Sequence, residues 1–204
     1  MGINKFCNGD LLSPEYNMKS VLKILTGLFM LVTVAVGYIP IPEYLVEFTC
    51  MSNSLGGILL IIDGILNFKD KNIPEFLYLN VCAGILFVFL ICLGSLSGMY
   101  HMNYSGAFFF LHATNPILLI LFYILTAKKT SAKKLKLLLL SPVLMLEYLL
   151  FDFILGNCRG YFVYGFVTPE ELSLVAAAIV GVVMYGIILL FSWLLLALNR
   201  LCQR

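Results

Sequence analysis

The sequence has little charge. Asp, Glu, Lys and Arg make up only 12% of its 204 residues, whereas 61% are apolar. A typical soluble domain is about a quarter charged and about half apolar. A soluble fold of this length would need far more polar side chains to cover its surface. The shortage of charge therefore argues against a soluble protein and indicates a chain embedded in a lipid bilayer.

Features of metal sites, disulfide frameworks and nucleic-acid binding are also missing. The six cysteines fall at no metal-ligand spacing, and most lie in apolar stretches where a cysteine packs as a small hydrophobe. The net charge of +2 is small and dispersed, unlike the basic clusters that contact phosphates. We therefore expect no metal, no cofactor and no nucleic-acid partner.

The short alternating segments of a membrane β-barrel are absent as well. Instead the chain contains apolar runs of about 20 residues, the length that a membrane-spanning helix needs. Six such runs can be placed, at residues 20–40, 48–67, 76–99, 105–127, 136–157 and 173–199. The sequence predicts an all-α, polytopic integral membrane protein, with residues 1–204 forming a single six-helix transmembrane domain.

Positive charges alternate between the connections of these runs. Twelve of the thirteen lysines and arginines lie before or just inside the start of the first run, between the second and third, between the fourth and the start of the fifth, or after the sixth, and the other is Arg159. Because positively charged loops are retained in the cytoplasm, the asymmetry predicts six spans with both termini cytoplasmic. The lysine run 128–136 is expected to fix this topology and to contact anionic headgroups.

A polar stripe opens the second run. Thr49, Ser52, Asn53 and Gly56 stand at i, i+3, i+4 and i+7, which is one face of a helix. Such a stripe faces a bundle interior or a water-filled cavity. For Ser52 and Asn53 a purely structural role is equally open, since Ser bonds its own helix and Asn ties helices together. By the predicted topology this stripe lies in the outer half of the membrane, and the inner half holds chiefly Asp63, Ser141 and Glu147.

One histidine is expected deep in the same outer half. His112 and Asn115 share a helix face at i, i+3, and Pro116 leaves the carbonyl of His112 without its helical donor. His101, the only other histidine, is expected near the surface. An ionisable group inside hydrocarbon is a functional candidate, although a lone histidine also commonly satisfies a neighbouring carbonyl.

The end of the fifth run adds polar groups on the same side. Tyr148 and Asp152 are spaced i, i+4, and Arg159 follows about two turns later. Asp152 is expected either to face the polar cluster or to form a structural ion pair with Arg159. Behind them comes the segment Gly160-Tyr161-Phe162-Val163-Tyr164-Gly165-Phe166.

Three fragments now follow one another in order. They are Phe48-Thr49 with Ser52-Asn53, Leu111-His112 with Pro116, and the Gly-Tyr-x-x-Tyr-x-Phe segment from Gly160 to Phe166. Over about residues 20–200 the chain resembles the family of six-span membrane proteins that contains the androgen-induced membrane proteins and the androgen-dependent TFPI-regulating protein. It is more similar still to the small bacterial relatives of that family. The resemblance implies a bacterial plasma membrane as the location.

The same resemblance implies hydrolysis of fatty acid esters of hydroxy fatty acids by an intramembrane threonine nucleophile with a histidine partner. Matching by motif carries the threonine onto Thr49 and the histidine onto His112. The vertebrate segment has an acidic or amide residue shortly after its threonine, where this chain has Ser52 and Asn53. The expected partner is a lipid or fatty acyl ester.

The residues themselves fit such chemistry. A threonine hydroxyl loses its proton as it attacks a carbonyl, and a neutral imidazole within reach can accept that proton. An oxyanion would need donors, such as Asn53, Asn115 or Tyr164, and Asp152 could orient the imidazole. The side chains expected to support the reaction or bind substrate are Ser52, Asn53, Asn115, Asp152, Arg159, Tyr161 and Tyr164.

Three other functions stay open at this point. The pair could transfer an acyl group to another lipid, or the polar cluster could bind a lipid or protein without catalysis. A small transporter would use the cluster as its substrate site. Against transport, the chain shows no inverted repeat and too few polar residues in its inner half to continue a path.

Overall fold

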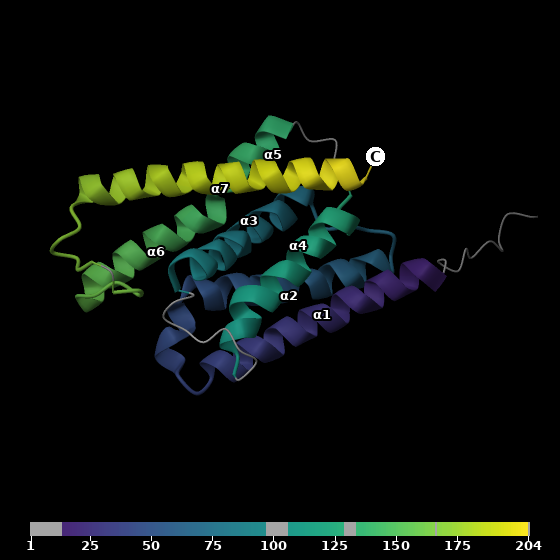
Figure 1. Cartoon of the computed structure of the whole chain (residues 1–204), viewed down its shortest axis with the longest axis horizontal. Helices are drawn as coiled ribbons and strands as arrows, with labels where there is room; N and C mark the ends of the chain where they lie inside the picture. The colour runs from purple at the N-terminus through teal and green to yellow at the C-terminus, as the bar shows by residue number, and fades with distance from the viewer. Residues whose placement is uncertain (1–13, 97–105, 129–133, 166, 204) are drawn as a thin grey trace, which may run out of the picture.

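The computed structural model describes residues 14–96, 106–128, 134–165 and 167–203. Every regular element within these ranges is helical, and they contain no strand (Figure 1), which confirms the predicted all-α class. His101, Phe166 and most of the lysine run 128–136 lie outside them. The elements are α1 (Pro14–Tyr38), the 3-10 helix η1 (Pro42–Val46), α2 (Phe48–Asn67), α3 (Glu75–Ile91), the π-helices η2 (Cys92–Leu96) and η3 (Phe110–Thr114), α4 (Asn115–Thr126), α5 (Lys134–Leu140), α6 (Val143–Arg159) and α7 (Leu174–Cys202).

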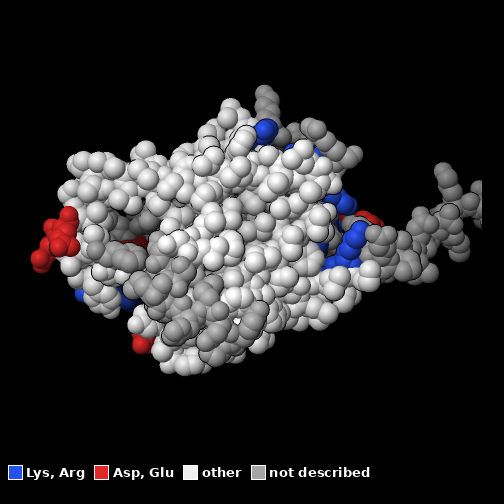
Figure 2. Space-filling model, in the orientation of Figure 1, with Lys and Arg blue, Asp and Glu red and all other residues white. Residues whose placement is uncertain are grey.

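Within the described ranges, five stretches of helix are long and apolar enough to cross a membrane, with α5 and α6 counted together as one, and Phe110–Thr126 forms a shorter apolar helix. Large apolar side chains are exposed along them; Leu174 and Val182 of α7 are each 74% exposed. On the face in Figure 2, described Lys and Arg atoms gather chiefly at the end where α7 finishes, and the middle is almost free of charge. Exposed apolar surface of this extent is expected of a protein surrounded by lipid.

Helices α1 and α2 pack as an antiparallel pair at very close range. A Cβ atom added at Gly27 would stand 2.5 Å from the Gly57 carbonyl oxygen, and one added at Gly64 would stand 2.7 Å from that of Ser20. Small residues let helix backbones approach in this way inside a membrane. The close packing sets the end of α1 beside the start of α2, where the polar stripe begins.

Buried ion pairs tie the helices together at the end of the molecule where α2 and α7 finish, which we call the ion-pair end. Lys23 Nζ lies 2.6 Å from Asp63 Oδ2 and 2.9 Å from Asn67 Oδ1. Arg200 Nη2 lies 2.7 Å from Glu75 Oε1. These contacts join α1 to α2 and α3 to α7, so a charge that hydrocarbon would reject is neutralised inside the protein.

The apolar run expected as one helix over residues 136–157 is broken into α5 and α6. Pro142 has no N–H to donate, and it disfavours helical geometry at Ser141 before it. Asn80 of α3 compensates, because its Oδ1 accepts the Leu144 N–H at 3.2 Å in the first turn of α6. Because of the break, the axis of α6 points in a different direction from that of α5, and α6 runs toward the start of α2 (Figure 1).

Candidate functional site

Thr49 and His112 meet where α2 and α4 begin. Thr49 lies in the first turn of α2 and is 4% exposed. Its Oγ1 is 3.5 Å from Nε2 of His112, which lies in η3 and is half-buried. Two residues 63 positions apart in the chain thus place a hydroxyl against an imidazole nitrogen.

The backbone decides which nitrogen of His112 carries the proton. Nδ1 lies 2.9 Å from the Phe108 carbonyl oxygen, and the Phe108 ring stacks on the imidazole with centroids 4.1 Å apart. Because a carbonyl oxygen only accepts, a neutral ring must donate from Nδ1 and present the Nε2 lone pair to Thr49. The Phe108 carbonyl therefore has the orienting role that sequence reasoning gave to Asp152.

A π-turn precedes α4 at this histidine. Within η3 the Asn115 N–H donates to the Phe110 carbonyl, five residues back, and Pro116 follows at once. Single π-turns inside helices often mark functional sites. Here His112 contacts Thr49, while Asn115 contacts other residues of the bundle interior.

Two buried amides hold this region together and use all of their donors to do so. Asn53 Nδ2 donates to the carbonyls of Thr49 (2.8 Å) and Leu111 (3.1 Å). Asn115 Nδ2 donates to Asn53 Oδ1 (2.9 Å) and Thr33 Oγ1 (2.8 Å). An amide NH₂ has two hydrogens, so neither side chain keeps one for a substrate oxygen. This geometry makes both amides positioning residues and argues against their predicted role as oxyanion donors.

The other predicted supporting residues have separate contacts. Ser52 Oγ donates to the Thr49 carbonyl at 3.3 Å, within its own helix. Asp152 Oδ1 accepts the Val163 N–H at 3.0 Å, which ties the segment after α6 back to that helix, and no ion pair joins Asp152 to Arg159 in the described ranges. Arg159 and Tyr161 line a small pocket of about 180 Å³ with Glu43, Tyr44, Val46, Leu155 and Val163.

Tyr164 reaches the Thr49–His112 pair from the loop after α6. Its hydroxyl lies by the Thr49 side chain and by the backbone N–H groups of Phe48 and Thr49. Burial raises the pKa of Tyr164, and the interactions with these groups offset part of that rise. The first N–H groups of a helix lack intrahelical acceptors, and the N-cap residue Glu47 offers no side-chain bond. The Tyr164 hydroxyl fills that place.

The side chain of a second tyrosine, Tyr148, also points toward the start of α2. It is 3% exposed, and its ring packs on Phe48 with centroids 4.9 Å apart. Its hydroxyl faces the Phe48 N–H and the Tyr164 hydroxyl, yet it forms no hydrogen bond of ordinary distance and angle.

Sequence reasoning missed three contributors. Thr33 accepts from Asn115, the Phe108 carbonyl orients His112, and the Tyr38 hydroxyl donates to Glu47 Oε2 at 2.8 Å. Burial raises the pKa of Glu47, and the bond from Tyr38 offsets part of the rise. A hydroxyl within an apolar run is the only sequence signal that Thr33 offered, and a backbone carbonyl offers none.

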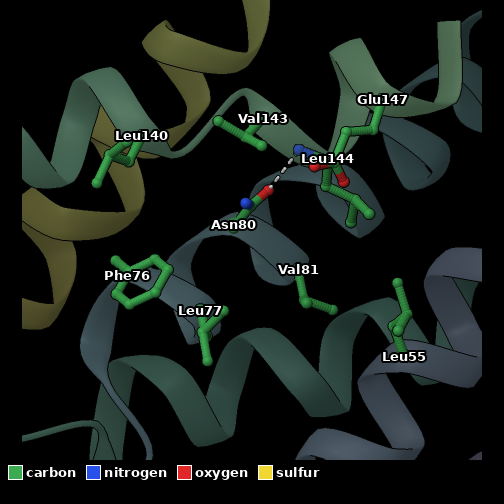
Figure 3. Close-up of a pocket in the computed structure, with 9 residues that line it drawn as sticks. All are labelled: Leu55, Phe76, Leu77, Asn80, Val81, Leu140, Val143, Leu144 and Glu147. Atoms are coloured by element: carbon green, nitrogen blue, oxygen red, sulfur yellow. Dashed lines mark hydrogen bonds between the residues drawn. The ribbon is translucent and has the colours of Figure 1, made fainter. Parts of the chain in front are cut away.

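A cavity of about 440 Å³, whose lining is drawn in Figure 3, includes neither Thr49 nor His112. It is an apolar groove between α3 and the α5–α6 break, with Asn80 and Glu147 as its polar members. Leu144, which lines the groove, and the ring of Phe48, the residue before Thr49, both lie near Gly84 of α3. The groove is lined by Leu55, Phe76, Leu77, Asn80, Val81, Leu140, Val143, Leu144 and Glu147.

Comparison of the chain with protein-family models, curated proteins and solved structures gives no match in any of the three. Within the described ranges, no three His, Cys, Asp or Glu side chains are grouped so that they could hold a metal ion. The chemistry of the cluster is therefore argued from its own geometry.

Proposed function

We propose that this protein is an intramembrane lipid ester hydrolase in which Thr49 is the nucleophile and His112 the general base. The observation that carries the proposal is the contact of Thr49 Oγ1 with His112 Nε2 at 3.5 Å, combined with an Nδ1 held by the Phe108 carbonyl. A nucleophile, a base and a group that orients the base are the three parts of an activated hydroxyl. Such hydrogen bonds are often long before substrate binds.

The reaction runs in two halves. Thr49 Oγ bonds to the ester carbonyl carbon, its proton moves to His112 Nε2, and the carbonyl electron pair moves onto oxygen. When the carbonyl re-forms, the bond to the alcohol oxygen breaks and that oxygen takes the proton from His112. Water then gives a proton to His112 as its oxygen bonds to the acyl carbon. The bond from that carbon to Thr49 Oγ breaks, Oγ takes the proton back from His112, and the acid is released. The sum is ester plus water to acid plus alcohol.

A membrane topology follows from this proposal and from the lysine asymmetry. The five long helices and Phe110–Thr126 make six spans, with both termini in the cytoplasm of a bacterial plasma membrane. The Thr49–His112 pair then lies in the outer leaflet, where an ester group sits near the headgroups and water has access.

The substrate is a lipid ester with a long acyl chain, of the class that includes fatty acid esters of hydroxy fatty acids. Support comes from the apolar groove of about 440 Å³, because its lining residue Leu144 and the ring of Phe48, next to the nucleophile, both lie near Gly84. In this proposal the groove holds the acyl chain, and burial of its methylene groups supplies much of the binding free energy.

The test compares Thr49→Ala with Thr126→Ala in purified protein. Thr126 is the control, because it is a half-buried threonine whose hydroxyl donates to the Phe122 carbonyl of its own helix (2.7 Å). We expect Thr49→Ala to lose both turnover of a panel of lipid esters and labelling by a fluorophosphonate, while Thr126→Ala keeps both. Equal activity in the two variants would reject Thr49 as the nucleophile.

A further inference from the structure

The start of α2 offers donors that the helix itself does not use. The N–H groups of Phe48 and Thr49 belong to the first turn, and no side chain of the N-cap residue bonds to them. The positive end of the helix dipole lies at the same point. Thr49 is both a donor here and the proposed nucleophile, so an oxygen bound at these N–H groups would lie beside the attacking hydroxyl.

An independent feature points to a ligand at this place. The Tyr148 hydroxyl is buried, faces the Phe48 N–H and has no hydrogen bond of ordinary geometry. A buried hydroxyl without a partner is costly, and it would gain one if an oxygen acceptor occupied the space in front of it. Its ring is held on Phe48, so the hydroxyl is directed before any ligand arrives.

The oxygen now in this position belongs to Tyr164. Its hydroxyl meets the Phe48 and Thr49 N–H groups and the Thr49 side chain. It reaches them from a loop in which Gly160 and Gly165 adopt positive φ angles of 81° and 64°. Tyr164 as a whole is 41% exposed, so only its inner end is enclosed.

We propose that the N–H groups of Phe48 and Thr49, together with the Tyr148 hydroxyl, form the oxyanion site of the hydrolase, and that the Tyr164 hydroxyl occupies this site until the ester carbonyl oxygen displaces it. The inference rests on the proposed function. In the substrate complex the carbonyl oxygen accepts from the two N–H groups. When Thr49 attacks, the electron pair that arrives on that oxygen is stabilised by these donors and by Tyr148, all placed beforehand.

The two tyrosines are therefore expected to act with opposite sign. Tyr148→Phe removes a donor to the transition state and should lower kcat about 100-fold, with KM little changed. Tyr164→Phe removes a competitor of the substrate and should raise kcat/KM several-fold. Tyr123→Phe is the matched control, because Tyr123 is equally buried and its hydroxyl equally unpartnered, but at the other end of the bundle.

The experiment measures each variant on one lipid ester and on its thionoester, in which sulfur replaces the carbonyl oxygen. Sulfur is a weak acceptor, so loss of an oxyanion donor should slow the ester more than the thionoester and reduce their rate ratio. This ratio does not depend on how much of a variant is folded. A ratio in Tyr148→Phe equal to that in Tyr123→Phe overturns the oxyanion site.

The remaining outcomes separate the two proposals. A drop in kcat for Tyr164→Phe like that of Tyr148→Phe would show that Tyr164 donates to the transition state, which overturns its role as occupant. If Thr49→Ala retains full turnover, the proposed function itself has failed. If turnover requires Thr49 but the ester-to-thionoester rate ratio is the same in Tyr148→Phe as in the wild type, only the oxyanion site has failed.

Discussion

Both ends of the bundle bury polar side chains, but they treat them differently. At the ion-pair end the two salt bridges are short, with Lys23 on Asp63 at 2.6 Å and Arg200 on Glu75 at 2.7 Å. At the opposite end, which we call the Thr49 end, the contact between Thr49 and His112 is 3.5 Å and involves neutral groups. The salt bridges hold the helices together, whereas at the Thr49 end the lone pair of His112 Nε2 can accept the proton of the Thr49 hydroxyl.

An unpartnered hydroxyl alone does not distinguish the two ends. Tyr123 belongs to the core and lacks a hydrogen bond as Tyr148 does. The difference is in the surroundings, since Tyr148 faces a helix N-terminus beside a nucleophile and base, whereas Tyr123 packs against Tyr78 with ring centroids 5.5 Å apart. What marks a reactive site in this protein is the coincidence of several groups, each of which would be unremarkable by itself.

The largest expected effect comes from removing the base at the Thr49 end. His112→Gln keeps a polar side chain but cannot accept the threonine proton, so ester turnover should fall about 100- to 10,000-fold. The melting temperature in detergent should stay close to that of the wild type, because His112 is only half-buried and its contacts are confined to Phe108 and the long contact with Thr49. Thr49→Ser should retain part of the rate, as its hydroxyl remains. A His112→Gln variant with undiminished turnover would contradict the mechanism.

The ion-pair end should respond in the opposite way. Lys23→Met leaves Asp63 buried without its cation, which should lower the free energy of unfolding by about 3–5 kcal/mol. Turnover per folded molecule should be unchanged. The double variant Lys23→Met, Asp63→Leu should recover much of the stability, since it leaves no unpaired charge. Denaturant unfolding in mixed micelles measures the free energy of unfolding of both variants. A single variant as stable as the wild type would show that the Lys23–Asp63 pair does not stabilise the fold.

A smaller effect is expected in the groove. Leu77→Trp places a bulky ring among the lining residues of the cavity in Figure 3. If the groove holds the acyl chain, turnover of long-chain esters should fall about tenfold, a loss of roughly 1.4 kcal/mol, and short-chain esters should be spared. Leu125→Trp, on an exposed position outside the groove, is the control. Equal losses on both chain lengths would place the chain elsewhere.

The smallest effect concerns pH and Glu47. Burial raises the pKa of this carboxyl in the folded chain, so folding disfavours its charged form. The unfolded chain then releases its proton first, and stability is highest at low pH and falls as the pH rises through the raised pKa. Glu47→Gln should remove this part of the decline. Melting temperatures between about pH 4 and 8 test it, and parallel curves for the two proteins would contradict it.

Much of the helical framework could be predicted from apolar runs. Helix α2 spans Phe48–Asn67, the bounds expected for the second run. The apolar composition of this run and the polar residues that flank it are both local features of the sequence. The split of the fifth run at Pro142 was missed, although proline carries a local signal for it. The contact of the Tyr148 ring of α6 with Phe48 depends on packing and had no signal in the sequence.

The sequence by itself determined that the chain is helical and suited to a bilayer, because hydrophobic content and spacing act residue by residue. It also placed Thr49 and Asn53 on one helix face, since the helical repeat fixes that relation. Only the tertiary structure decided that Thr49 contacts His112 and that the Phe108 carbonyl selects the tautomer of that histidine. It also decided that the amides of Asn53 and Asn115 donate to neighbouring helices, and that Tyr148 packs at the start of α2. These relations join segments far apart in the chain, and a hydrogen bond depends on distances of a few tenths of an ångström that no local pattern encodes.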